Sequence, residues 1–201
     1  MDHIVLDVEV STDIERLPNG WDDTHKMEIA VAAVMDAGTG RFDLYDNDTR
    51  SRRSLLDRIQ KADRITTYNG WQFDIPVILG VERKSWLSGR MVPGRLKTRS
   101  DDLFKRIKSA AQHDEEFRPR KNQLDLGSVC SLNLGTTKTG NGREVIGIYR
   151  ERRFAELANY CMNDVRVTKA LCDHIDRTGR IGITNRNKTL VLTVGQWDDD
   201  R

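Results

Sequence analysis

The chain has 201 residues, of which 37% are hydrophobic and 32% are charged. This composition is typical of a single globular domain with a substantial core and a heavily charged surface. The formal net charge of +2 is nearly balanced, so total charge gives no sign of nucleic-acid binding, and no apolar run reaches the ~18 residues of a membrane span.

The first half of the chain predicts strands that alternate with helices. Residues 4–10 alternate apolar side chains with other residues, which is the two-residue period of a strand. After a polar loop, an apolar run over 27–35, a glycine-rich turn and a short run over 42–45 predict an antiparallel hairpin. The further elements expected here are a helix over 54–62, a strand over 64–68 and a helix over 73–79.

The second half of the chain predicts mainly helices. One helix is expected over 100–111, with Ser100 as a possible N-cap, and a short one over 124–132. The longest helical pattern, over 154–177, places apolar residues three or four apart and ends before Gly179, a natural C-cap.

These elements predict an α/β fold in which helices flank a mixed sheet of about five strands, combining an antiparallel hairpin with parallel strands. One domain is expected over 1–179, followed by a C-terminal extension over 180–201. Two apolar runs in that extension, 181–183 and 190–194, predict a β-hairpin packed on the same domain.

The three cysteines, Cys130, Cys161 and Cys172, are odd in number, widely spaced and form no Cys-x-x-Cys pair. This pattern predicts reduced, buried thiols in a cytoplasmic protein. Because the first predicted strand begins almost at the N-terminus, we also expect no signal peptide. The sequence thus favours a soluble intracellular protein.

Two carboxylates stand out in the first predicted strand. Asp7 and Glu9 lie on one face of it, about 7 Å apart, while Leu6 and Val8 mark the opposite face as buried. Adjacent carboxylates in the middle of a sheet repel each other and lose hydration, which a hard divalent cation would offset. The alternative is an edge strand whose polar face meets water.

Two further acidic residues lie in predicted helices, Asp74 at the start of one and Asp164 in the middle of another. Asp74 lies where a strand ends, the chain turns and a helix starts, so that helix capping is one interpretation. Asp164 lies within the long helix, four residues after Tyr160 and therefore on the same helical face. A solvated position is the alternative for Asp164.

Taken together, these segments resemble the three exonuclease motifs of the DnaQ-like (DEDD) 3′–5′ exonucleases. The matching segments are Asp7-Val8-Glu9, Asn69-x-x-x-Phe73-Asp74 and Tyr160-x-x-x-Asp164. The tyrosine four residues before the last aspartate marks the DEDDy branch, because the position at which the other branch has histidine is Asn159. The residues in and around these motifs are most similar to those of the proofreading domain of family-B DNA polymerases. The resemblance runs from about residue 4 to 175 and implies an RNase H-like fold.

The resemblance implies a site for two divalent metal ions, Mg²⁺ or Mn²⁺, which suit an oxygen-rich set of ligands. Asp7 would bridge the two ions, and Glu9 and Asp164 would hold the one that activates water. Asp74 would hold the second ion, partly through water. Tyr160 would hydrogen-bond the attacking water, and since a tyrosine has an unperturbed pKa of about 10, orientation is a better role for it than base catalysis.

The resemblance also points to residues that would bind substrate. Asn69 and Phe73 occupy positions that help to hold the terminal nucleotides in the family, although Phe73 could equally pack in the core at a helix start. Trp71 could stack on a base or anchor the loop. Lys138, in Leu134-Gly135-x-x-Lys138, resembles a family position near the site and could contact a phosphate.

One segment is locally basic. Residues 83–121 contain twelve Lys or Arg against five Asp or Glu, an excess of seven positive charges. A cationic flank beside an acidic metal site would guide a single strand, whereas a merely solvated charge run is the alternative.

The expected function is a stand-alone, metal-dependent 3′–5′ exonuclease that releases nucleoside monophosphates from the 3′ end of DNA, with single-stranded DNA favoured. Its setting would be replication, repair or recombination. An RNA 3′–5′ exonuclease of the same branch is one alternative. A non-catalytic module that binds nucleic-acid ends is another, although the complete set of four carboxylates and a tyrosine argues against it.

Overall fold

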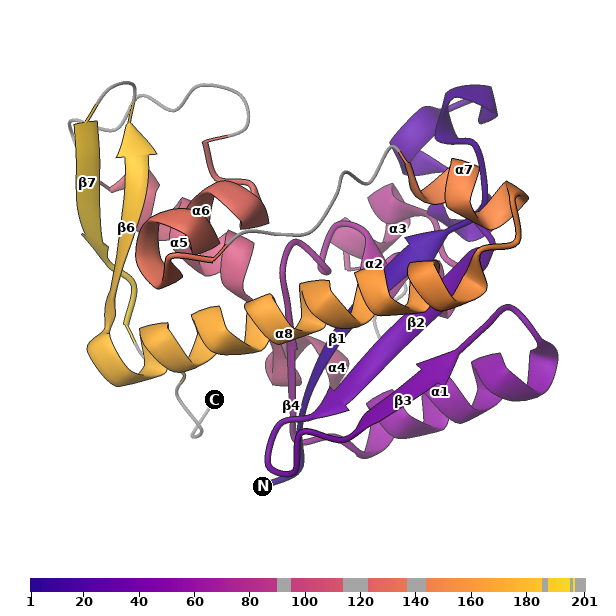
Figure 1. Ribbon diagram of the computed structural model, residues 1–201, viewed down its shortest axis with the longest axis horizontal. Coiled ribbons are helices and arrows are strands. Elements are labelled where there is room, and N and C mark those ends of the chain that lie inside the picture. Colours follow the sequence, from indigo (N-terminus) through magenta and orange to yellow (C-terminus); the bar gives the residue numbers. More distant parts are fainter. Residues whose placement is uncertain (90–94, 114–122, 137–143, 186–187, 196, 198–201) are drawn as a thin grey trace.

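The computed structural model (Figure 1) describes residues 1–89, 95–113, 123–136, 144–185, 188–195 and 197. Its centre is a five-stranded sheet in the order β3-β2-β1-β4-β5. The strands are β1 (His3–Val10), β2 (Ile29–Asp36), β3 (Phe42–Tyr45), β4 (Arg64–Thr67) and β5 (Ser100–Asp102). Neighbours on the β1-β2-β3 side are antiparallel, and β4 and β5 run parallel to β1. The predicted α/β class, a mixed sheet flanked by helices, is confirmed.

Eight helices accompany the strands in the described part of the chain. They are α1 (Thr49–Lys61), α2 (Asp74–Leu79), α3 (Arg83–Leu87), α4 (Leu96–Arg99), α5 (Leu103–Gln112), α6 (Leu126–Leu134), α7 (Val145–Arg150) and α8 (Phe154–Thr178). The long predicted helix is α8, and it ends at Gly179, whose φ of 66° is the left-handed value that favours glycine at a C-cap. Among the described helices, none is long and apolar enough to cross a membrane.

The two faces of β1 pack against different elements. Ile4, Leu6 and Val8 belong to an apolar core shared with α1 and α2. On the other face, Val5 packs in a cluster with Cys161 and Val165 of α8. Figure 1 shows α8 lying across β1 and β2. Because side chains alternate along a strand, Asp7 and Glu9 share the face of Val5, toward α8.

Two predicted helix starts are wrong. α1 begins at Thr49 rather than 54, because the Asp48 side chain caps it by accepting hydrogen bonds from the amides of Arg50 and Ser51, and the charged first turn has no apolar period. Ser100 is not an N-cap but the first residue of β5, and Asp102 caps α5 instead. A strand of three residues is too short to show a two-residue period.

The polar loop after β1 contains three short 3-10 helices, η1 (Ile14–Arg16), η2 (Gly20–Asp22) and η3 (Thr24–Lys26). At the other end of the chain, β6 (Arg180–Asn185) and β7 (Lys188–Thr193) form a separate antiparallel pair. Its apolar residues Ile181, Ile183 and Leu192 are buried in one cluster with residues of α5, α6 and α8. The hairpin thus packs on α5, α6 and α8.

Candidate active site

Three carboxylates from distant parts of the chain converge between β1 and α8. Asp7 and Glu9 are half-buried on β1, and Asp164, which is 1% exposed, comes from the middle of α8. One ligand oxygen of each lies within 4.8 Å of the other two. The apolar cluster around Val5 and Val165 holds the helix against the strand and so brings these carboxylates together.

Asp74, the first residue of α2, approaches the same strand from another side. Its Oδ1 accepts a hydrogen bond of 2.7 Å from the backbone amide of Val8. The pairing of β1 with β4 ends at Val5 and Thr66, so the Val8 amide lies beyond it. The Asp74 carboxylate therefore supplies the hydrogen-bond acceptor that β4 no longer provides. The structure therefore places Asp74 beside Asp7 and Glu9, outside the group of three.

Burial and like charge act together on Asp74. The side chain is 3% exposed, and burial, followed by the negative charge of Asp7, raises the pKa of Asp74 well above its usual value. The hydrogen bond from Val8 opposes this shift without reversing it. A cation held between Asp74 and Asp7 would relieve both the desolvation and the repulsion.

Cys161 and Tyr160 occupy the α8 turn that faces β1. The Cys161 Sγ lies 3.4 Å from the backbone oxygen of Asp7 and 3.5 Å from its Oδ2, and burial raises the pKa of this thiol well above its usual value. It is a free, buried cysteine, as are Cys130 and Cys172. Tyr160 is buried in the same apolar cluster, one helical turn before Asp164.

A pocket of about 330 Å³ opens beside the carboxylates. Asp7, Glu9 and Asp74 line it, together with Asn69 and Phe73, the two residues expected to hold substrate. Sequence reasoning did not single out four other residues of its lining, namely Trp21, Tyr68, Gln72 and Arg83, although Arg83 begins the basic segment 83–121.

The turn that carries Asn69 is held by residues far away in the sequence. The Asp102 carboxylate accepts hydrogen bonds of 2.9 Å from the backbone amides of Asn69 and Trp71. Gly70 packs so closely on Thr67 that an added Cβ would lie 2.5 Å from the Thr67 Cβ. The turn therefore requires a glycine at this position.

Trp71 and Lys138 differ from the other predicted substrate residues. Trp71 packs on Trp86 with ring centroids 4.5 Å apart, its backbone oxygen accepts a hydrogen bond from the Trp86 indole, and the Lys105 ammonium lies 5.5 Å from its ring centroid. This packing favours the role of a loop anchor for Trp71. Lys138 lies outside the described residues.

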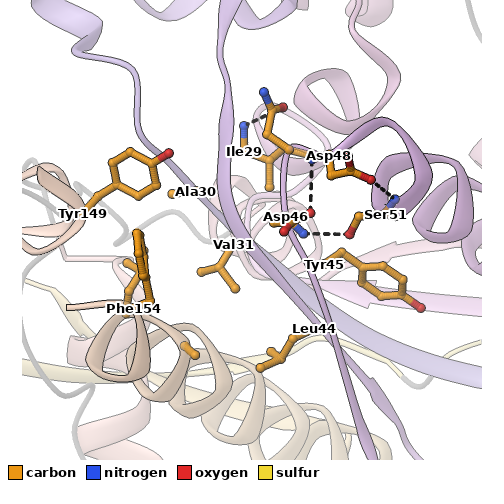
Figure 2. Close-up of a pocket in the computed structure, with 13 residues that line it drawn as sticks. Ile29, Ala30, Val31, Leu44, Tyr45, Asp46, Asp48, Ser51, Tyr149 and Phe154 are labelled. Carbon is orange, nitrogen blue, oxygen red and sulfur yellow. Dashed lines mark hydrogen bonds between the residues drawn. The ribbon is translucent and has the colours of Figure 1, made fainter. Parts of the chain in front are cut away.

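A second, larger pocket of about 570 Å³ lies between the β2-β3 edge and the start of α8 (Figure 2). Val31, Leu44 and Phe154 give it an apolar lining. Its acidic residues serve local structure, since Asp48 caps α1 and the Asp46 carboxylate accepts a hydrogen bond of 3.1 Å from the amide of Asp48. None of the predicted site residues within the described ranges lines this pocket, so its size does not make it the better candidate.

The carboxylates are a suitable ligand set for hard divalent cations. Asp7, Glu9 and Asp164 offer only oxygen atoms, close enough to share one ion, and Asp74 adds another carboxylate next to them. Oxygen-rich sites of this kind suit Mg²⁺ and Mn²⁺. The residues present therefore fit the metal that the sequence motifs imply.

Comparison with known proteins places the chain near DNA polymerases. Its sequence is 27% identical over 186 residues to a DNA polymerase of Thermococcus litoralis, and the match covers 79% of this chain and 11% of that polymerase. The structure is similar to the family B DNA polymerase from the hyperthermophilic archaeon Pyrobaculum calidifontis, with a TM-score of 0.61 and 20% identity, over 87% of this chain and 24% of that one. No family model matches the chain. It thus shares the fold of a part of a family B DNA polymerase and spans a small fraction of the length of these relatives.

Proposed function

We propose that this chain is a metal-dependent 3′–5′ exonuclease that releases nucleoside monophosphates from the 3′ end of DNA, with single-stranded DNA as its preferred substrate. The observation that carries the proposal is the convergence of Asp7, Glu9 and Asp164 within 4.8 Å of one another. Asp7 and Glu9 also line a pocket, so these carboxylates are accessible to a substrate.

Each carboxylate has a proposed role. Asp7, Glu9 and Asp164 would hold one divalent ion, and Asp74 would hold a second one together with Asp7. Bound metal ions of this type neutralise charge on the attacking and leaving oxygens of a phosphodiester and lower the pKa of water. The carboxylates would hold these ions beside the pocket, where the scissile phosphate would enter.

The remaining residues position the reactants. Tyr160 lies on α8 one turn before Asp164, so its phenol is on the helical face of that carboxylate and would orient the attacking water. Asn69 and Phe73 line the pocket and would hold the terminal nucleotide. Their positions are fixed by the turn that Asp102 and Gly70 stabilise.

The comparisons support DNA as the nucleic-acid partner. Both relatives are named as DNA polymerases. One is similar in sequence and the other in fold, in each case over most of this chain. We propose that the activity resides in these 201 residues and serves DNA replication or repair.

The direct test is digestion of a 5′-labelled single-stranded oligonucleotide with Mg²⁺, in parallel with an RNA of the same sequence. A ladder that shortens from the 3′ end, and that disappears with a chelator, is the expected result for DNA. Binding without shortening would instead indicate a non-catalytic module. Faster digestion of the RNA would reassign the substrate.

A matched pair of variants links the activity to the site. Asp164→Asn should lower the rate at least about 100-fold, the effect of removing one charge-stabilising group from an active site. Asp173→Asn is the control, because Asp173 lies on the same helix but is exposed and pairs with Lys169. Equal activity of the two variants would contradict the proposed site.

A further inference from the structure

Two residues at the mouth of the pocket are not used by the proposed chemistry. Trp21, on η2, and Arg83, the first residue of α3, both line the pocket that Asp7 and Glu9 line. Neither belongs to the sequence motifs, and both come from segments without periodic pattern. Their chemistry, an indole and a guanidinium, differs from that of the carboxylates opposite.

The Trp21 indole presents an open aromatic surface. Its side chain is 56% exposed although its ring makes an edge contact with Phe73, with centroids 5.4 Å apart and an interplanar angle of 67°. Single exposed aromatic residues are ordinary on protein surfaces. This one lines a pocket beside a metal-ligand set and continues the aromatic wall that Phe73 begins, which is the arrangement of a stacking platform.

The neighbouring Asp22 fixes this aromatic residue and leaves positive charge beside it. The Asp22 carboxylate accepts a hydrogen bond of 3.0 Å from the Arg83 Nε and pairs with the Lys84 Nζ at 2.9 Å. Two cations thus share one carboxylate, so this trio has a net charge of +1. These contacts hold η2 against α3 and place the guanidinium at the pocket.

We infer that Trp21 and Arg83 bind the terminal nucleotide of the substrate, with its base stacked on the Trp21 indole beside Phe73 and a phosphate paired with the Arg83 guanidinium. This inference rests on the proposed function and specifies how substrate is selected. A base that enters the pocket to stack on Trp21 has to leave the stack of a duplex, whereas an unpaired 3′ end reaches it without breaking base pairs. Trp21 therefore favours unpaired 3′ ends.

The test combines variants with altered oligonucleotides. Binding is measured by fluorescence anisotropy in the Asp164→Asn background with Mg²⁺, for a single strand with an ordinary 3′ end and for one whose terminal nucleotide lacks its base. Trp21→Ala should weaken binding of the ordinary strand roughly 5- to 150-fold, the range of one stacked base, and leave the abasic strand within about twofold. Trp21→Phe should restore most of the affinity.

Substitution of Arg83 should change binding in a different way. Arg83→Gln should weaken both strands alike and reduce the slope of log Kd against log salt by about 0.7, the value for one lost phosphate contact on a single strand. The matched controls are Phe154→Ala, an exposed aromatic residue at the other pocket, and Arg153→Gln, an arginine paired with Glu151 and Glu156.

The outcomes separate this inference from the proposed function. Equal weakening of ordinary and abasic strands by Trp21→Ala would indicate a structural role and overturn the stacking. Should the wild-type chain shorten DNA while the Trp21 and Arg83 variants bind like their controls, the inference fails and the exonuclease stands. A wild-type chain that leaves 3′ ends intact refutes the exonuclease itself.

Discussion

At the scale of single residues, β1 has a buried network of ion pairs beside its start and a group of carboxylates toward its end. Arg64, at the start of β4 and 5% exposed, donates hydrogen bonds to Asp101 and Asp176. Burial alone would lower the pKa of Arg64, but these two carboxylates outweigh burial and raise it. The guanidinium therefore stays charged next to the first residue of β1, roughly 13 Å along the strand from Asp7.

His3 shows the effect of this network. Its Nε2 lies 2.9 Å from the Thr66 hydroxyl oxygen. Burial, followed by the charges of Arg64 and Lys169, lowers the pKa of His3 from 6.5 to about 4, although the nearby carboxylates act in the opposite direction. His3 is thus neutral in the folded chain at pH values where it is protonated in the unfolded chain.

This shift predicts a pH dependence of stability. Between pH 6.5 and about 4 the unfolded chain binds a proton at His3 that the folded chain does not, so the stabilisation from neutral His3 is present above pH 6.5 and is lost as the pH falls. The free energy of unfolding of the wild type should fall more steeply over this window than that of His3→Gln. Urea denaturation at several pH values measures this free energy for both proteins, with His174→Gln as the control for loss of a histidine. Parallel curves for wild type and His3→Gln would contradict the prediction.

At the scale of elements, the turn between β4 and α2 sets the geometry of the pocket. It carries Asn69, whose φ of 67° is unusual for a residue other than glycine, and ends at Asp74. Three separate contacts stabilise this shape: Asp102 binds two of its amides, Gly70 packs on Thr67, and Asp74 binds Val8. The turn is thus tied to β5, β4 and β1 at once.

Gly70→Ala should disrupt the turn. The added Cβ would overlap the Thr67 side chain, so the free energy of unfolding should fall by about 1–3 kcal/mol, the usual cost of overpacking. The control is Gly147→Ala in α7, where the new Cβ meets nothing within 4 Å and the alanine should be neutral or stabilise the helix by up to about 1 kcal/mol. Urea denaturation of both variants checks this. A Gly70→Ala variant as stable as Gly147→Ala would show that the turn adapts.

The same elements show what could be predicted from the sequence and what could not. Alternation identified β1, and spacing three or four apart identified α8, because both patterns arise from the apolar side chains that share one face of the element. Motif spacing singled out Asp74, Tyr160 and Asp164. The contacts of Asp102 and Arg83 were missed because they span 33 and 61 positions of the chain, to Asn69 and Asp22 in irregular segments where no period connects the partners.

At the scale of the whole molecule, three apolar clusters join the sheet, the helices and the C-terminal hairpin. The first packs α1 and α2 under the sheet, the second joins α5, α6 and α8 to β6 and β7, and the third holds α8 on β1 and β2. α8 contributes to the last two clusters. It therefore connects the five-stranded sheet with the hairpin of β6 and β7.

The hairpin should unfold together with the rest of the domain. Ile183 is fully buried in the second cluster, so Ile183→Ala should lower the free energy of unfolding by about 2–5 kcal/mol in a single transition. Val191→Ala, at a position that is 62% exposed, should change it by less than about 0.5 kcal/mol. Urea denaturation followed by circular dichroism and by tryptophan fluorescence measures both. A separate early transition in either signal would make the hairpin an independent unit.

The origin of the three converging carboxylates also affects how the chain matures. Asp7 and Glu9 leave the ribosome with β1, whereas Asp164 follows only when α8 has been synthesised. Contacts between such distant segments are formed late, because the entropy of closing so long a loop opposes them until neighbouring parts are in place. A nascent or half-folded chain consequently holds only part of the ligand set, and the three carboxylates meet only once α8 has packed on β1.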